Sequence, residues 1–296
     1  MQIGWIGLGN MGSRIAKRLR DSGYPLMVYN RDPSKAEELI SQGAELAAYP
    51  AELADAVDVI FSCLSDADAV QSVYFGADGV LQTAKPGTHI VEMSTVAPET
   101  SLHLFRAGRE LDIPVLDVAI SGSTPAAESG SLTLFGGGER EAFEFMTPLF
   151  KAISRQWFYM GPSGSGMAMK LVVNAILGVG MQAIAEALAL GGQLGLSCDL
   201  LFDTLAKTAV VAPAHLGKLA TAKRRDYSPQ FPLHLMAKDF DLILSKSAEL
   251  GVDMPATVAA AERNAVEAVH GGDEDFSAVI RLMEHSQIES SNLINK

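Results

Sequence analysis

The feature that most limits the possible folds of this chain is a glycine-rich turn near its N-terminus. Gly7-Leu-Gly9-Asn-Met-Gly12 follows an apolar run and leads into an amphipathic stretch with helical spacing. In such a strand–turn–helix, the first glycine permits a tight turn, the second lets a pyrophosphate approach the backbone, and the third lets helix and strand pack closely. The helix N-terminus then faces the phosphates. The predicted dinucleotide site comprises Gly7, Leu8, Gly9, Asn10, Met11 and Gly12.

Short apolar runs and amphipathic stretches alternate through the first half of the chain, which is typical of βαβ units in a doubly wound sheet. The predicted strands are Ile3–Gly7, Pro25–Asn30, Glu45–Ala47, Val57–Cys63, His89–Met93, Val115–Val118 and Ser131–Gly136. The predicted helices are Met11–Ser22, Ser34–Gln42, Pro50–Ala54, Ala67–Phe75, Glu99–Leu111 and Arg140–Ala152.

After Gly166 only helical spacing remains. The predicted helices are Met167–Leu194, Cys198–Thr208, Leu216–Arg224, Leu235–Glu249, Met254–Ala268 and Phe276–His285, followed by a frayed tail from Ser290. We therefore predict an α/β Rossmann-type domain over residues 1–162, a connecting long helix over 163–194, and an all-α domain for substrate binding and dimerisation over 195–290. A long apolar helix with glycines often finds part of its cover in a second subunit, so we expect a homodimer or homotetramer.

Composition narrows the classes of partner. The 296 residues include 23 Lys+Arg and 35 Asp+Glu, a formal charge of -12, which argues against nucleic acid or an anionic membrane. Cys63 and Cys198 lie far apart and six histidines are scattered, so we expect free thiols and no metal site. The chain begins as a strand and not as a signal peptide, so we expect a cytoplasmic protein. Asn174, Gln182 and Glu186 interrupt the apolar run Leu171–Leu196, which favours a buried helix over a membrane span.

The end of the second predicted strand bears on the choice of cofactor. NAD-binding domains usually carry an acidic residue there, whereas this chain has Asn30-Arg31-Asp32, with Lys35 close behind. Asn30 does not repel a phosphate, and Arg31 suits charge-assisted bonds to a 2′-phosphate. We predict that NADP(H) is preferred, while Asp32 keeps NAD(H) open. Arg31 and Lys35 as plain surface charges are the alternative.

Three further polar segments follow predicted strands, at the edge of the sheet where α/β proteins bind ligands. Leu64-Ser65 is a candidate contact to the cofactor and Thr95 a candidate contact to its nicotinamide half, with ordinary helix-capping loops as the alternative. Ser121-Gly122-Ser123 offers two hydroxyls and backbone N–H groups to a carboxylate, with a plain turn as the alternative.

A second glycine-rich segment carries the chemistry that we predict. Gly161, Gly164 and Gly166 lead into an apolar helical run that bears Lys170 and Asn174. Four residues are just over one helical turn, so these two side chains point the same way. A lysine on an apolar helix face is costly unless it has a task, which indicates an acid/base; a lysine reaching out from a helix end is the alternative.

Four separated motifs resemble those of the β-hydroxyacid dehydrogenase family, which includes the 3-hydroxyisobutyrate dehydrogenases. The matching residues are Gly7, Gly9 and Gly12 in the dinucleotide motif, Asp117, Ser121, Gly122, Ala127, Gly130 and Leu132 in the substrate motif, Gly161, Gly164, Gly166, Lys170 and Asn174 in the catalytic motif, and Lys238 and Asp239 in the cofactor-side motif.

The resemblance implies a 6-phosphogluconate dehydrogenase-like fold with Lys170 and Asn174 as catalytic residues. It implies that Ser121, Gly122, Ser123, Phe231 and Asp239 bind a small carboxylate substrate and that Lys238 contacts the cofactor. Ser123 and the segments at 94–96, 99–101, 231–233 and 275–279 are similar to the glyoxylate/succinic semialdehyde reductase subgroup, which prefers NADPH. Ala119, His234 and the segment 212–216 depart from the usual pattern.

These observations predict NADPH-dependent reduction of glyoxylate or succinic semialdehyde. Oxidation of 3-hydroxyisobutyrate, L-serine or a similar β-hydroxy acid is the first alternative. Imine reduction is disfavoured, because imine-specialised relatives usually replace the lysine. A non-catalytic dinucleotide-binding module is the alternative from another class of protein, and the intact Lys170 disfavours it.

Overall fold

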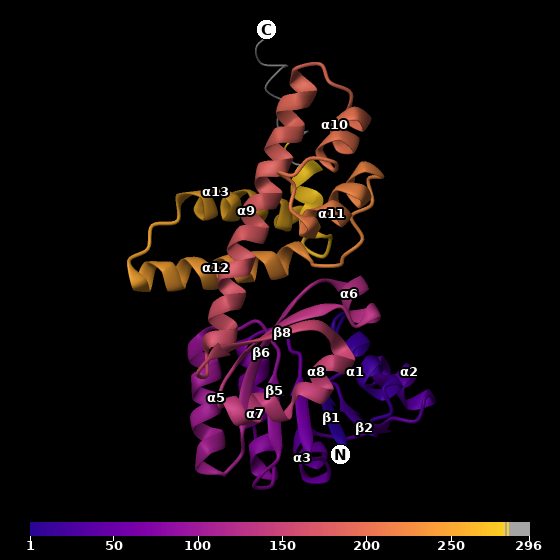
Figure 1. Ribbon diagram of the computed structural model, residues 1–296, viewed down its shortest axis with the longest axis vertical. Helices are drawn as coiled ribbons and strands as arrows, with labels where there is room; N and C mark the ends of the chain where they lie inside the picture. The colour runs from indigo at the N-terminus through magenta and orange to yellow at the C-terminus, as the bar shows by residue number, and fades with distance from the viewer. Residues whose placement is uncertain (282, 284–296) are drawn as a thin grey trace. The chain divides into compact units, whose positions relative to one another are not determined.

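A computed structural model describes residues 1–281 and 283 (Figure 1). The chain forms two compact units, Met1–Lys170 and the part from Leu171 onward, and the division falls within one long helix. The end of the predicted helix at His285, the tail from Ser290 and the domain limit at residue 290 lie outside the described residues.

The first unit is built on an eight-stranded sheet with the order β3-β2-β1-β4-β5-β6-β7-β8 (Figure 1). Every neighbouring pair is parallel except β6 and β7. Parallel neighbours place their carboxyl ends at the same edge of the sheet. The strand order reverses between β1 and β4, because β2 and β3 lie on one side of β1 and the later strands lie on the other. Ligands of α/β proteins bind at the carboxyl edge near such a reversal. The strands are β1 (Ile3–Ile6), β2 (Leu26–Tyr29), β3 (Glu45–Leu46), β4 (Val59–Ser62), β5 (His89–Glu92), β6 (Val115–Ser121), β7 (Leu132–Gly137) and β8 (Ser154–Gly161).

Helices connect these strands much as the sequence predicts, with one break. The predicted helix 140–152 is two helices, because Pro148 cannot donate a hydrogen bond to the preceding turn and instead opens a new helix. The helices are α1 (Gly12–Asp21), α2 (Glu37–Ser41), α3 (Pro50–Ala56), α4 (Ala67–Phe75), α5 (Pro98–Glu110), α6 (Thr124–Ser129), α7 (Arg140–Phe145) and α8 (Thr147–Ile153), with 3-10 turns η1 (Pro33–Ala36) and η2 (Val80–Gln82).

One strand and one α-helix of this unit are missing from the sequence prediction. Strand β8 exposes large apolar side chains such as Phe158 and Met160, so it lacks the buried apolar run by which the other strands are identified. Phe158 of β8 stacks on Phe135, its register partner in β7, with ring centroids 6.3 Å apart. Helix α6 spans only six residues, too few for a clear periodic pattern.

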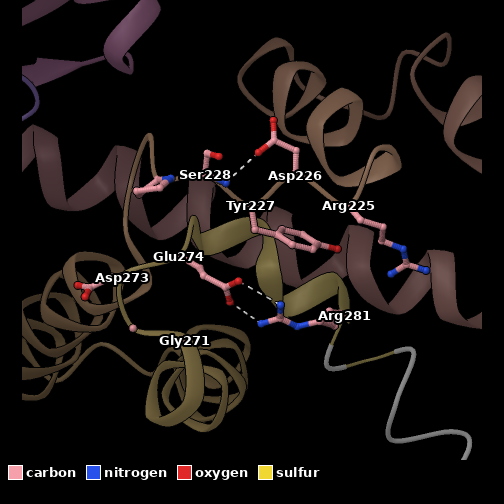
Figure 2. Close-up of a pocket in the computed structure, with 10 residues that line it drawn as sticks. Arg225, Asp226, Tyr227, Ser228, Gly271, Asp273, Glu274 and Arg281 are labelled. Carbon is pink, nitrogen blue, oxygen red and sulfur yellow. Dashed lines mark hydrogen bonds and ion pairs between the residues drawn. The ribbon is translucent and has the colours of Figure 1, made fainter.

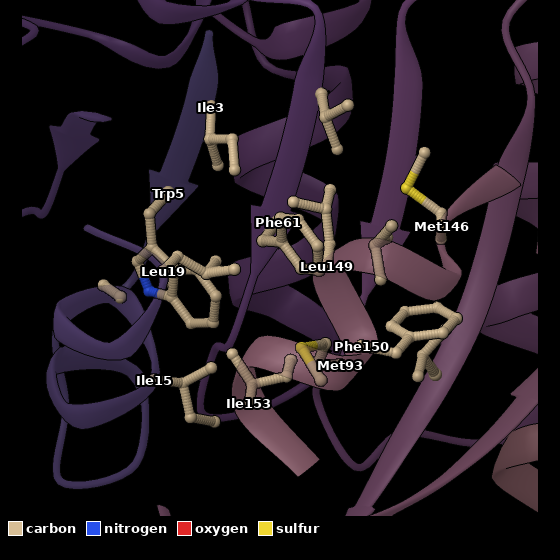
Figure 3. Packing of buried hydrophobic residues seen from close by; sticks show 14 of the residues in the cluster. Ile3, Trp5, Ile15, Leu19, Phe61, Met93, Met146, Leu149, Phe150 and Ile153 are labelled. Atoms are coloured by element: carbon tan, nitrogen blue, oxygen red, sulfur yellow. The ribbon is translucent and has the colours of Figure 1, made fainter. Parts of the chain in front are cut away.

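The core of the first unit lies between the sheet and α1 and α8 (Figure 3). Trp5 of β1 stacks on Phe61 of β4, its partner in the strand register, with centroids 5.6 Å apart. Ile15 and Leu19 stand one turn apart on α1 and are fully buried against this layer. The apolar residues of α1 recur at helical spacing, so the helix after the glycine turn packs against β1, the strand before the turn.

The second unit is helical. Its elements are the rest of α9 (Ser165–Gln193), α10 (Cys198–Leu205), α11 (Pro213–Lys223), α12 (Leu233–Leu250), α13 (Pro255–Gly271) and the 3-10 turn η3 (Phe276–Ala278). Gly178 of α9 lies against the ring of Phe240 of α12, so these helices pack at close range.

Helix α9 is long and apolar enough to cross a membrane by length and composition. Within the second unit, however, its inner side is packed against the other helices: Met181, Ala185 and Leu188 belong to the core of that unit. The polar side chains of Asn174 and Gln182 are buried there too. The helix therefore serves as the core helix of the second unit.

Candidate active site

The predicted site residues fall in both units. The first unit holds the glycine turn, the strand-end loops and Lys170. The second unit holds Asn174, Phe231, Lys238 and Asp239.

The glycine turn has the geometry that a dinucleotide requires. Gly7 adopts φ +95, and a Cβ there would collide with the carbonyl oxygen of Cys63; a Cβ at Gly12 would collide with the carbonyl of Gly7. At Gly9, by contrast, a Cβ would meet nothing within 4 Å, so the backbone is open to a ligand. No side chain caps the N-terminus of α1. Ser13 N donates to the carbonyl of Gly9 at 3.1 Å, and the other N–H groups of the first turn are left to an anion. These residues fit a pyrophosphate.

Asn30 holds the glycine turn in place. Its amide oxygen accepts a hydrogen bond from Leu8 N at 2.8 Å, and its amide nitrogen donates to the carbonyl of Asp32, also at 2.8 Å. An aspartate at this position would offer a second acceptor to that carbonyl and repel it. The asparagine therefore joins the turn to the loop that carries the candidate 2′-phosphate contacts.

The loop after β2 leaves its two cations exposed. Asp32 is committed to its own turn, where Oδ1 accepts from Ser34 N and Oγ at 3.1 and 2.7 Å. These hydrogen bonds, from the hydroxyl first, lower the pKa of the Asp32 carboxyl. Arg31 and Lys35 are exposed beside it and are available to a phosphate from solvent.

The loops after β4 and β5 are tied to each other. Ser94 Oγ accepts from Leu64 N at 2.7 Å, and Ser94 N donates to Glu92 Oε1 at 2.8 Å. Thr95, the candidate nicotinamide contact, follows directly and is half-buried. The sequence prediction missed Glu92 and Ser94 as supports of this edge, although both stand within three residues of Thr95 in the chain.

Glu92 is a fully buried carboxyl group at the end of β5. Oε1 also accepts from Ser62 Oγ at 3.4 Å, while Oε2 has no hydrogen-bond partner among the described residues. Burial raises the pKa of Glu92 to about 7, and the neighbouring Asp117 charge adds to this, against the hydrogen bonds of Ser94 and Ser62. Near neutral pH, Glu92 is therefore substantially protonated.

Replacement of Glu92 by Gln tests this protonation. Between its ordinary pKa of 4.5 and about 7, the folded state keeps a proton that the unfolded chain has lost, so Glu92 makes stability fall as the pH rises. Glu92→Gln keeps an oxygen for Ser94 N and removes this slope. We expect the difference between the unfolding free energies of variant and wild type to shift by about 3 kcal/mol in favour of the variant between pH 4.5 and pH 8. Urea unfolding across that range measures the gain; parallel curves would contradict it.

The candidate carboxylate cradle lies where β6 ends. Gly122 adopts φ +128, and a Cβ there would also press on Leu132 and Ala126. The hydroxyls of Ser121 and Ser123 make no hydrogen bond with any other described residue, even though Ser123 stands at the N-cap position of α6. Two hydroxyls and a glycine backbone are thus left to a ligand.

Asp117 anchors the helix that carries Lys170. Asp117 Oδ1 accepts from Gly164 N at 2.7 Å and Oδ2 from Met167 N at 3.0 Å, at the start of α9. A negative charge at a helix N-terminus is stabilising. Burial raises the pKa of Asp117, and the backbone N–H groups oppose that rise. The sequence places Asp117 in the substrate motif, whereas the structure gives its carboxylate to the helix.

Lys170 is half-buried and stands one turn inside α9 from this anchor. Asn174, on the same face of the helix, is fully buried and donates from Nδ2 to Asp239 Oδ2 at 2.5 Å. Lys238 Nζ lies 3.4 Å from Asp239 Oδ1. Asn174 Oδ1 has no hydrogen-bond partner among the described residues. An amide oxygen on the face of Lys170 is therefore left to accept a hydrogen bond.

Phe231 is half-buried at the turn before α12. Its ring meets that of Phe276 edge-on, with centroids 5.6 Å apart, and its backbone N–H donates to Asp275 at 3.0 Å. Two of the departures from the family pattern, His234 and the segment 212–216, lie in this second unit, whereas Ala119 lies in β6. His215 is buried and donates from Nε2 to the carbonyl of Leu177 at 2.9 Å, so it acts as a core residue.

A cavity of about 770 Å³ in the second unit contains none of the predicted site residues (Figure 2). It is lined by residues 225–229, 271–274 and Arg281, whose guanidinium pairs with Glu267 and Glu274. The charge of Arg281 is thus already neutralised. Among the described residues, no group of three or more His, Cys, Asp or Glu side chains is placed to hold a metal ion.

Comparison with known proteins agrees with this geometry. The family model for the NAD binding domain of 6-phosphogluconate dehydrogenase matches residues 2–161. That for the NAD-binding domain of NADP-dependent 3-hydroxyisobutyrate dehydrogenase matches residues 164–283.

Individual relatives match along nearly the whole chain. Glyoxylate/succinic semialdehyde reductase 1 of Arabidopsis thaliana is 38% identical over 97% of this chain and 100% of its own. The NAD-dependent L-serine dehydrogenase of Pseudomonas aeruginosa is 34% identical over 97% of this chain and 99% of its own. The crystal structure of a 3-hydroxyisobutyrate dehydrogenase from Salmonella typhimurium, 26% identical, superposes with a TM-score of 0.87 over 95% of this chain and 99% of its own. This chain belongs to the β-hydroxyacid dehydrogenase family and is an NAD(P)-dependent oxidoreductase that acts on CH–OH groups.

Proposed function

We propose that this enzyme uses NADPH to reduce small aldehyde acids, such as glyoxylate and succinic semialdehyde, to hydroxy acids. The observation that carries the proposal is the link between two motifs: Asp117 fixes the helix of Lys170 onto β6, the strand that ends in the Ser121–Ser123 cradle. A proton donor and a carboxylate site thus share one rigid element. The similarity to a plant glyoxylate/succinic semialdehyde reductase supports this substrate class.

In the proposed reaction the bound nicotinamide supplies the hydride. Ser121 and Ser123 donate their hydroxyls, with the backbone at Gly122, to the substrate carboxylate. Lys170 donates a proton from Nζ to the carbonyl oxygen and stabilises the negative charge that develops there. In the reverse direction, neutral Lys170 takes the proton of the alcohol.

Asn174 acts as an acceptor in this scheme. Its Nδ2 faces the carboxylate of Asp239, which accepts only, so the amide orientation is fixed and Oδ1 points elsewhere. Asn174 Oδ1 then accepts from the ammonium of Lys170 or from the substrate hydroxyl. We assign Phe231 and Asp239 to the substrate side and Lys238 to the cofactor side, as the family motifs imply.

Initial rates test this function and the cofactor preference together. We expect NADPH to be oxidised with glyoxylate and succinic semialdehyde, and NADH to be oxidised less efficiently. Arg31→Ala should raise the KM for NADPH about 10- to 100-fold and leave that for NADH within about twofold, since only the 2′-phosphate contact is lost. Arg106→Ala, at another exposed arginine, is the matched control. Equal effects on both cofactors would refute Arg31 as the phosphate contact.

Oxidation of a β-hydroxy acid is the second candidate, because the L-serine and 3-hydroxyisobutyrate dehydrogenases match the same full length. The same residues serve this direction, with Lys170 as the base. NADP- or NAD-linked oxidation of L-serine and 3-hydroxyisobutyrate, with no reduction of either aldehyde acid, would establish it in place of the first.

We propose a homodimer or homotetramer in solution. Ile176 and Leu190 of α9, and Leu194 just after its end, are exposed by more than 60% at helical spacing, which is an apolar stripe typical of a subunit contact. Light scattering that gives the mass of one chain would exclude this.

We also propose a cytoplasmic location. Among the described residues, neither Cys63 nor Cys198 forms a disulfide, as expected in a reducing compartment. Cell fractionation tests the proposal, and recovery in an oxidising compartment would contradict it.

A further inference from the structure

We propose that the buried ion pair between Lys218 and Asp275 is a positioning device that fixes Phe231, and through it the affinity of the enzyme for its acid substrate. This inference rests on the proposed function for the role of Phe231. It concerns residues of the second unit alone.

The ion pair is almost fully withdrawn from solvent. Lys218 Nζ lies 2.5 Å from Asp275 Oδ2, and the two side chains are 7% and 3% exposed. Lys218 comes from α11, whereas Asp275 directly precedes the turn η3. Lys218 Nζ also donates to Gln230 Oε1 at 3.3 Å and stands 5.4 Å from the ring centroid of Phe276.

Asp275 uses both carboxylate oxygens to hold backbone. Oδ2 accepts from the N–H groups of Gln230 and Phe231 at 3.1 and 3.0 Å, besides Lys218. Oδ1 accepts from Ser277 N and Oγ at 3.2 and 2.7 Å. One carboxylate, that of Asp275, therefore connects residues 230–231, which precede α12, with the start of η3.

The same two segments are joined around Phe231 itself. Phe276 N donates to the carbonyl of Phe231 at 2.9 Å, and Pro232 pairs with Asp275 as an isolated antiparallel bridge. The ring of Phe276 contacts both partners: the Lys218 ammonium stands 5.4 Å from its centroid, and the centroid of the Phe231 ring lies 5.6 Å away. Backbone and ring of Phe231 are thus both set by the cluster Lys218, Gln230, Asp275, Phe276 and Ser277.

Stability alone does not account for burying these charges. Removing two charges from water is expensive, and well-packed apolar side chains in their place are often as stable or more so. A fully hydrogen-bonded charge pair does, however, select one backbone arrangement over near alternatives. The half-buried ring of Phe231 lies beside the ion pair, so a single fixed backbone arrangement there would hold this ring in one position for the substrate.

A double-mutant cycle tests whether the ion pair acts through Phe231. Lys218→Gln removes the charge and retains a hydrogen-bond donor; Phe231→Ala removes the ring. We expect each to raise the KM for the aldehyde acid about 5- to 20-fold, with the KM for NADPH and kcat within about threefold. The double variant should be no worse than Phe231→Ala alone, because the pair has no other route to the substrate. Additive effects, or an unchanged KM in Lys218→Gln, would overturn the proposal.

Leu188→Ala is the control for a general loss of stability. Leu188 lies in the core of the same unit and outside the cluster, so its truncation lowers the melting temperature without a specific path to Phe231. We expect its KM to stay near that of the wild type. If Leu188→Ala raised the KM as much as Lys218→Gln at equal loss of stability, the ion pair would be structural only.

Hydrogen exchange tests the positioning without turnover. In Lys218→Gln and Asp275→Asn, the amides of Gln230 and Phe231 should exchange at least about tenfold faster, while amides in the middle of α9 change little. Unchanged exchange at both amides would overturn the proposal. The rates of the wild-type enzyme test the proposed function separately from the positioning role of the ion pair. If the wild type turns over only a β-hydroxy acid, reduction of aldehyde acids is refuted, and the double-mutant cycle is then measured with that β-hydroxy acid.

Discussion

Lys170→Ala is expected to lower kcat about a thousandfold while the dissociation constant for NADPH stays within about twofold. Lys170 is the one basic side chain in the segment 161–174, and its helix is locked to β6 by Asp117. General acid catalysis by a positioned group contributes about 10²- to 10⁴-fold, and stabilisation of the developing charge adds to it. Single-turnover oxidation of NADPH with glyoxylate, together with a fluorescence titration of NADPH, measures both quantities.

Lys170→Arg distinguishes two roles for the lysine. Arginine keeps the positive charge but does not give up a proton at any working pH. If Lys170 is the acid, the arginine variant should stay at least about a hundredfold slower than the wild type. If the lysine served only to attract the carboxylate, arginine would restore most of the rate, and the assignment would be wrong.

Gly166→Ala is expected to destabilise the protein strongly, although it adds only one methyl group. Gly166 is the second residue of α9, and a Cβ there would collide with the carbonyl oxygens of Asp117 in β6 and Phe135 in β7. Because both obstacles are backbone atoms, relief requires the helix to move away from the sheet. We expect a loss of about 3 kcal/mol or more in the free energy of unfolding. The rate should fall with it, because Lys170 follows on the next turn.

Gly192→Ala is the matched control on the same helix. A Cβ at Gly192 would meet nothing within 4 Å, and its backbone is ordinary helix. Alanine should therefore stabilise the protein by about 0.5 to 1 kcal/mol, through the better helix propensity. Urea unfolding of both variants measures the two opposite signs. Similar losses in both would mean that the space around Gly166 does not govern the result.

Several parts of this protein follow from short stretches of sequence. The turn Gly7–Gly12, the seven strands β1–β7 and the helical second half were predicted correctly, since each depends on backbone sterics or on side-chain period within one element. Lys170 and Asn174 share a face for the same reason, as four helical residues fix their relation. Strand β8 was not predicted, because its large apolar side chains are exposed and form no buried run. The break at Pro148 was not predicted, because a single proline interrupts an otherwise helical pattern.

The supports of the site were decided only by the tertiary structure. Asn30 meets Leu8 across 22 residues, Asp117 meets Gly164 across 47, Lys218 meets Asp275 across 57, and Asn174 meets Asp239 across 65. A polar residue in the sequence shows that a hydrogen bond is needed but not which group makes it, because the partner depends on how distant elements pack. The sequence by itself thus determined the elements and the reactive groups. The packing of the sheet edge and of the helices determined which carboxylate holds the lysine helix, which amide oxygen stays unpaired, and what fixes Phe231.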